Sequence, residues 1–83
     1  MEIGELIRGR LEAMGRQPSD LVRELDRVGA GVTRQSVHAW LHGEARPRMR
    51  HVLALWDVLS IAPEDRDEWL AALASPREVR DGA

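Results

Sequence analysis

The sequence predicts an all-α fold, a compact bundle of five short helices. Apolar residues recur at spacings of three and four along the chain, and no stretch shows the apolar–polar alternation of a strand. Glycine or proline separates the apolar stretches, as expected between helices. The chain has 83 residues and no cysteine, so it is the size of one small domain without disulfide bonds or thiolate metal sites.

The first two helices are expected over residues 2–14 and 18–28. Gly15 ends the first, and Pro18 suits the first turn of the second, with Gln17 before it as the N-cap. Each helix carries apolar residues along one side, which predicts a buried face. These residues are Ile3, Leu6, Ile7, Leu11 and Met14 in the first helix and Leu21, Val22, Leu25 and Val28 in the second.

The other three helices are expected over residues 34–42, 48–59 and 63–74. Thr33 is a favourable N-cap for the third helix, and Pro63 opens the last one. The apolar spacing again defines one inner side for each helix. The residues on these sides are Val37, Trp40 and Leu41, then Val52, Leu55, Trp56 and Leu59, and finally Trp69, Leu70 and Leu73.

No long linker divides these elements, so residues 1–75 are expected to form one domain and residues 76–83 a polar tail. The start of the chain is charged and acidic and resembles neither a signal peptide nor a membrane span. The sequence therefore predicts a soluble, cytoplasmic protein with no membrane partner.

The charge is unevenly distributed along the chain. The net charge of −2 argues mildly against a nucleic-acid partner, because such domains are usually basic. The distribution reduces that objection, since a basic middle segment precedes an acidic one and predicts two faces with different roles. The middle segment has Arg34, Arg46, Arg48 and Arg50 against Glu44; the later one has Asp57, Glu64, Asp65, Asp67 and Glu68 against Arg66.

Two helices joined by a glycine-containing turn, the second beginning at a threonine cap, form the helix-turn-helix arrangement. The ordered series over residues 3–61 resembles the phage-repressor and Cro-type family, also called XRE-like. The resemblance implies a lambda-repressor-like five-helix bundle of the helix-turn-helix type. The residues that carry it are Gly15, Leu21-Val22, Gly31-Val32-Thr33, Val37, Trp40, Gly43, Arg46 and Pro47, followed by Met49, Val52, Leu53, Leu59 and Ile61.

Two departures from the family pattern affect the geometry. The connection between the second and third helices is longer than the usual tight turn by about four residues. The family commonly pairs an Arg late in the first helix with a Glu near the end of the recognition helix, and these positions are Leu11 and Leu41 here. Because packed apolar side chains can replace an ion pair, Leu11 and Leu41 are expected to touch.

The resemblance implies a sequence-specific transcriptional regulator, a repressor, that binds double-stranded DNA with its third helix in the major groove. Arg34, Gln35 and Ala39 would occupy base-reading positions, with Ser36 and His38 close enough to serve base or phosphate. The family's phosphate-holding positions correspond to Gln17, Thr33, His42 and Arg46.

The same resemblance implies a homodimer on a palindromic site. Helices four and five are the expected dimer surface, because Trp69, Leu70 and Leu73 exceed what so short a helix needs for itself. The alternative is that these side chains only close the core of the monomer.

The sequence also fits other functions. Arg34, Gln35 and His38 also fit the solvated face of an amphipathic helix, and the acidic final helices also suit a protein-interaction module without DNA. His38 and His42 have a spacing that can bind metal, but a zinc site needs further ligands, so no metal is expected. We expect no cofactor, no small-molecule ligand and no enzymatic activity, since no catalytic residue pattern is present.

Overall fold

The computed structural model describes residues 2–74, and among them it contains helices and no strand. The all-α prediction is therefore confirmed. The expected tail, residues 76–83, lies outside the described residues. The elements are α1 (Ile3–Ala13), α2 (Pro18–Arg27), α3 (Arg34–Leu41), α4 (Met49–Val58), a short 3₁₀ turn η1 (Pro63–Asp65) and α5 (Arg66–Ala74).

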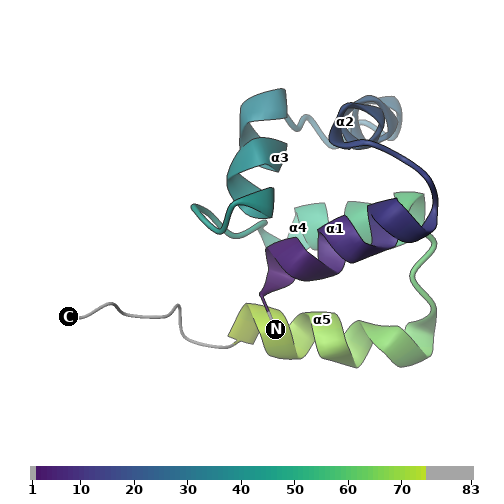
Figure 1. Ribbon diagram of the computed structural model, residues 1–83, viewed down its shortest axis with the longest axis vertical. Coiled ribbons are helices and arrows are strands. Elements are labelled where there is room, and N and C mark those ends of the chain that lie inside the picture. Colours follow the sequence, from purple (N-terminus) through teal and green to yellow (C-terminus); the bar gives the residue numbers. More distant parts are fainter. Residues whose placement is uncertain (1, 75–83) are drawn as a thin grey trace.

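The helices lie in three tiers (Figure 1). α2 and α3 form the upper tier, α1 and α4 the middle one, and α5 lies beneath them. α1 packs against α2, α3 and α5, while α2 also packs against α3 and α4. The apolar side of each helix therefore faces a neighbour, and the upper tier leaves one side of α3 open to solvent.

At the start of each of the first three helices, a side-chain oxygen accepts a hydrogen bond from a backbone N–H group. Thr33 Oγ1 accepts a hydrogen bond of 3.1 Å from the backbone N–H of Ser36, as the threonine cap predicts. At the start of α2, Pro18 occupies the first turn and the backbone N–H of Gln17 donates to Asp20 at 2.9 Å. The N–H of Glu2 donates in the same way to Glu5 at 3.1 Å.

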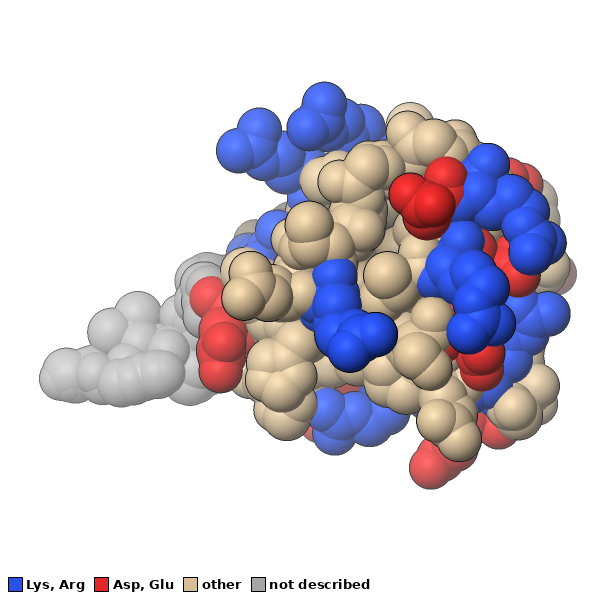
Figure 2. Space-filling model, turned by 90° about the horizontal axis from the view of Figure 1, so that it is seen from above, with Lys and Arg blue, Asp and Glu red and all other residues tan. Residues whose placement is uncertain are grey.

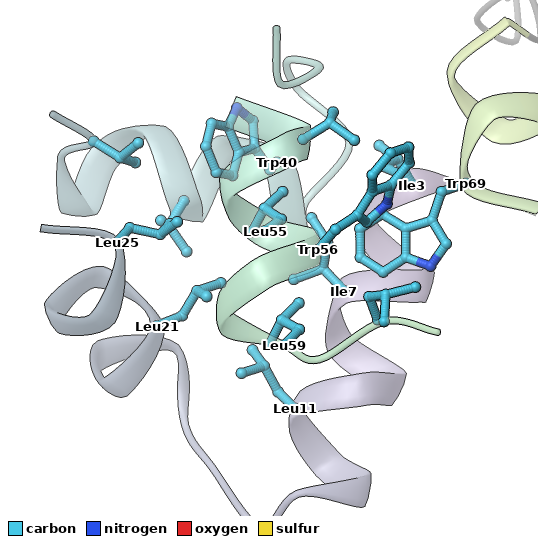
Figure 3. Packing of buried hydrophobic residues seen from close by; sticks show 14 of the residues in the cluster. Ile3, Ile7, Leu11, Leu21, Leu25, Trp40, Leu55, Trp56, Leu59 and Trp69 are labelled. Atoms are coloured by element: carbon cyan, nitrogen blue, oxygen red, sulfur yellow. The ribbon is translucent and has the colours of Figure 1, made fainter. Parts of the chain in front are cut away.

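The core lies between the tiers and receives side chains from every helix (Figure 3). Leu21 and Leu25 of α2 face Leu55 of α4, and Trp56 of α4 lies near Trp69 of α5 beside α1. Trp69 is only 3% exposed, so its indole closes the core of the monomer. The buried apolar residues are Ile3, Ile7, Leu11, Leu21, Leu25, Val32, Val37, Trp40, Val52, Leu55, Trp56, Leu59, Ile61, Trp69 and Ala72.

Within residues 2–74, three arginines donate hydrogen bonds to backbone carbonyls at the carboxyl ends of helices. A carboxyl-terminal turn has carbonyls without a helical partner and a partial negative charge, and a guanidinium supplies both a donor and a positive charge. The bonds are Arg8 to Leu41 at the end of α3 (2.7 Å), Arg10 to Leu59 after α4 (2.8 Å) and Arg46 to Leu73 in the last turn of α5 (2.8 Å).

The connection between α2 and α3 covers residues 28–33, so it is as long as the sequence indicates. Gly29 and Gly31 both have positive φ, at 76° and 67°, a conformation that glycine adopts without strain. The N–H of Ala30 donates to the carbonyl of Leu25 at 3.0 Å, and Val32 is buried. The connection is therefore anchored at both ends rather than loose.

Candidate nucleic-acid interface

α3 is amphipathic, with one side in the core and the other in solvent. Val37 and Trp40 are 1% and 3% exposed and fix the helix to the bundle. Arg34, Gln35 and His38 are exposed, as is His42 just after the helix; Ser36 and Ala39 are half-buried on its flanks. The structure thus brings four of the nine expected DNA-contacting residues, Arg34, Gln35, His38 and His42, to the solvent-facing side of α3 and its carboxyl end.

A groove of about 410 Å³ lies between the start of α2 and α3. Gln17 and Ser19 line it at the start of α2, and Arg34, His38 and His42 line it along α3 and just after it. The groove therefore brings together four residues that the sequence indicates as DNA-contacting: Gln17, Arg34, His38 and His42. Gln17 and His42 are 25 residues apart in the sequence. Ser19 was not singled out; its place after Pro18 in the first turn of α2 is the signal that could have found it.

The two histidines of this face lie against each other. The ring centroids of His38 and His42 are 4.0 Å apart, with an angle of 34° between the ring planes. No group of three or more His, Cys, Asp or Glu residues within residues 2–74 is arranged to hold a metal ion. Both rings line the groove, and a neutral imidazole has one donor and one acceptor nitrogen.

Figure 2 shows the upper tier from above, with charged side chains coloured. Over α2, on the right, acidic and basic side chains are intermixed. Carboxylates of α2 also form ion pairs: Glu24 pairs with Arg16 (3.6 Å) and Arg27 (3.5 Å), and Asp20 pairs with Arg23 (3.5 Å). Over α3, basic side chains lie mainly among neutral ones. The local charge over α3 therefore differs from the net charge of the chain.

Thr33 and Ser36 are engaged with each other at the start of α3. Thr33 Oγ1 accepts from the N–H of Ser36 and donates to Ser36 Oγ, both at 3.1 Å. The hydroxyl of Thr33 thus acts on the helix start itself. The expected contact of Thr33 with a phosphate stays a prediction. The backbone N–H groups in the first turn of α3 are the kind of donor that binds phosphate.

Arg46 does not line the groove between α2 and α3. Its Nη1 donates to the carbonyl of Leu73 at 2.8 Å in a half-buried position, so its guanidinium lies against α5. The resemblance assigns Arg46 to phosphate, whereas the structure gives it a bond within the fold. Nothing in the local sequence shows this bond, because its acceptor lies 27 residues further on.

We therefore expect Arg46→Ala to destabilise the fold by about 1.5–3 kcal/mol, the range for a hydrogen bond to a charged group. Urea unfolding followed by circular dichroism measures this change. Arg48→Ala is the matched control, because Arg48 is exposed and close in sequence, and it should change stability by less than about 0.5 kcal/mol. Equal stability of the two variants would contradict the structural role of Arg46.

The comparisons with known proteins identify no relative. No family model matches the sequence, no curated protein is significantly similar to it, and no solved structure matches its fold. In addition, no helix within residues 2–74 combines the length and apolar character needed to cross a membrane. The function must therefore be argued from the geometry and charge of the face on α3.

Proposed function

We propose that this protein is a sequence-specific DNA-binding regulator, a repressor, acting on double-stranded DNA in the cytoplasm. The observation that carries the proposal is the exposed row of Arg34, Gln35 and His38 on a helix fixed from behind by Val37 and Trp40. A helix with this exposure fits the major groove, where its first residues reach base edges.

The exposed side chains have donors and acceptors that suit base edges. The Arg34 guanidinium can donate two hydrogen bonds to a guanine, and the Gln35 amide can pair with the donor and acceptor of an adenine. The small Ala39 side chain suits contact with a thymine methyl group. Ser36 and His38 lie next to these residues on α3 and extend the polar surface available to the DNA.

Phosphates would bind at the groove beside this row. The start of α2 at Gln17 offers backbone N–H groups and the positive end of a helix dipole. His42 lines the same groove from the other side. Contacts of this kind fix the position of a helix on the duplex, while the base contacts supply specificity.

The test is selection of bound sequences from random duplex DNA, with the wild type and with Arg34→Ala and Gln35→Ala. We expect the wild type to enrich one motif, and each variant to lose its preference at one base position by about 1–3 kcal/mol. Arg23→Ala is the control, because Arg23 is exposed on α2 and paired with Asp20, away from the groove. If neither Arg34 nor Gln35 affects the motif, α3 does not read the bases.

The proposed repressor acts as a homodimer through α4 and α5. Most of the large apolar side chains left exposed among residues 2–74 lie on these helices: Met49 (47%), Leu53 (53%) and Leu70 (40%). The Arg66 guanidinium of α5 lies 5.0 Å from the centre of the Trp56 ring of α4. This contact connects the two helices about one turn along the chain from Leu53 and Leu70. Trp69, by contrast, is taken up by the monomer core. A dimer would place two copies of α3 about one turn of DNA apart, about 34 Å.

The doubly substituted Leu53→Glu, Leu70→Glu protein should be monomeric by sedimentation equilibrium, and it should bind a palindromic site no better than a single half-site. The charges would be buried unpaired in the dimer, which is costly. Val28→Glu is the control, because Val28 is equally exposed (47%) but lies after α2. If the double variant remains dimeric, α4 and α5 do not form the interface.

One observation favours a second function, a protein-interaction module on the same scaffold without DNA binding. A groove of about 480 Å³ lies between α1, α5 and the turn before η1. Its lining combines apolar Leu6 and Ile61 with the carboxylates of Glu5, Asp65 and Glu68. Such a module would enrich no DNA sequence in the selection described above.

A further inference from the structure

α1 meets the carboxyl end of α3 at two residues that lie one helical turn apart. Gly4 approaches so closely that a Cβ atom there would overlap the carbonyl oxygen of Trp40 and would lie 3.1 Å from that of Leu41. Arg8 Nη2 donates to the same Leu41 carbonyl at 2.7 Å. We call Gly4, Arg8, Trp40 and Leu41 the α1–α3 junction.

The carbonyl of Leu41 differs from the others in the last turn of α3. The chain that follows the helix supplies N–H donors to the preceding carbonyls, but Leu41 receives its hydrogen bond from the side chain of Arg8. The carbonyl of His38 accepts from His42, that of Ala39 from Glu44 and Ala45, and that of Trp40 from Gly43. Arg8 therefore completes the carboxyl end of α3 from a different helix.

The connection at the other end of α3 is long. Residues 28–33 separate α2 from α3, so a short turn does not set the angle between the two helices. Val37 and Trp40 hold α3 against the core, and a fixed point at its carboxyl end would set how the helix is turned about that contact. The α1–α3 junction supplies both a close backbone contact and a charge-assisted hydrogen bond.

We propose that Arg8 is a positioning residue that fixes the orientation of α3 and, through it, the reading of DNA bases. Arg8 acts through the Leu41 carbonyl and does not itself contact the DNA. The second half of this inference rests on the proposed function, whereas the first half concerns the free protein alone.

Arg10 provides a matched control within the same helix. It also lies on α1 and donates to backbone carbonyls at the end of a helix, those of Leu59 at 2.8 Å and Ser60 at 3.4 Å. Those carbonyls follow α4 rather than α3. Arg8→Ala and Arg10→Ala thus remove the same side chain and the same kind of bond, but only the first removes a bond to α3.

The first experiment measures residual dipolar couplings of the backbone N–H groups in the free, full-length chain. In Arg8→Ala, the couplings of α3 should no longer fit the orientation that satisfies α1 and α4 in the wild type. In Arg10→Ala, α3 should keep its wild-type orientation relative to α1. An unchanged α3 in Arg8→Ala would overturn the proposal without any reference to DNA.

The second experiment measures binding of the same proteins to the selected DNA motif and to an unrelated duplex. Arg8→Ala should bind the motif about tenfold more weakly, because α3 is then held in the binding orientation for a smaller fraction of the time. Its binding to the unrelated duplex should change less than about twofold, because non-specific binding depends on phosphate contacts. Arg8→Lys, which keeps the charge and a donor, should recover part of the lost affinity for the motif. Arg10→Ala should keep the wild-type ratio of the affinities for the motif and the unrelated duplex.

Two outcomes would contradict the role in recognition, in different ways. If Arg8→Ala weakens both duplexes equally and reduces the salt dependence, Arg8 contacts phosphate and is not a positioning residue. If the wild type enriches no DNA sequence, the proposed function is wrong and the role in recognition is lost with it. The dipolar couplings then still decide whether Arg8 orients α3.

Discussion

Replacing Gly4 by alanine should lower the free energy of unfolding by about 1–3 kcal/mol, the cost of forcing an extra methyl group into a packed interior. The added Cβ would overlap the carbonyl oxygen of Trp40, which is backbone and cannot turn away as a flexible side chain can. α1 and α3 must therefore separate. Because about 1 kcal/mol shifts the melting temperature of a domain this size by about 4–8 °C, thermal unfolding followed by circular dichroism detects the change easily.

Gly9→Ala is the matched control for this experiment. Gly9 lies in the middle of the same helix and is exposed, and a Cβ added there would meet no atom within 4 Å. Alanine favours the helix over glycine, so this variant should gain about 0.5–1 kcal/mol. Replacing glycine by alanine should thus lower the free energy of unfolding at Gly4 and raise it at Gly9. A gain in stability at Gly4 would mean that α1 and α3 are not in close contact.

The helices of this protein were predictable because their signals are local. Apolar spacing located every helix, and Thr33, Pro18 and Gly15 marked where helices begin or end. The expected start of the last helix at Pro63 was less accurate, since the chain first forms a 3₁₀ turn and α5 begins at Arg66. Proline fixes φ near the value that both helix types share, so the sequence does not distinguish them there.

The partners of the arginines were not predictable, because they are set by tertiary packing. Arg8 bonds to a carbonyl 33 residues away and Arg46 to one 27 residues away, and every residue has a carbonyl. The sequence therefore gives no sign of which carbonyl is reached. For the same reason the expected contact between Leu11 and Leu41 stays a prediction, while α1 is seen to reach Leu41 through Gly4 and Arg8.

The exposed row on α3 could be anticipated from helical periodicity, but its chemical meaning could not. Spacing alone predicts that Arg34, Gln35 and His38 lie on the side of the helix away from Trp40, and all three are exposed in the structure. The groove beside them depends on how α2 packs against α3, which brings Gln17 towards His42. Binding of DNA by this face would depend on charge, so the dependence of the affinity on ionic strength tests it.

The affinity for the selected DNA motif should fall steeply with salt, because each arginine or other cation that neutralises a phosphate releases counterions. A dimer with about six phosphate contacts should lose about 10³ in affinity between about 50 and 200 mM salt. Fluorescence anisotropy titrations over that range give the slope of log affinity against log salt. A protein-interaction module on this scaffold would show no DNA affinity to titrate.

The slope also decides what Arg46 does. If Arg46 contacts phosphate, as the family resemblance implies, Arg46→Ala should reduce the slope by about one for each protomer. We expect the slope to stay unchanged, because the guanidinium is held by the Leu73 carbonyl and its loss removes a bond within the fold rather than one to DNA. The titrations must be run well below the melting temperature of the variant, so that a smaller folded fraction does not imitate weaker binding. A reduced slope in a fully folded Arg46→Ala protein would show that Arg46 leaves α5 when DNA binds.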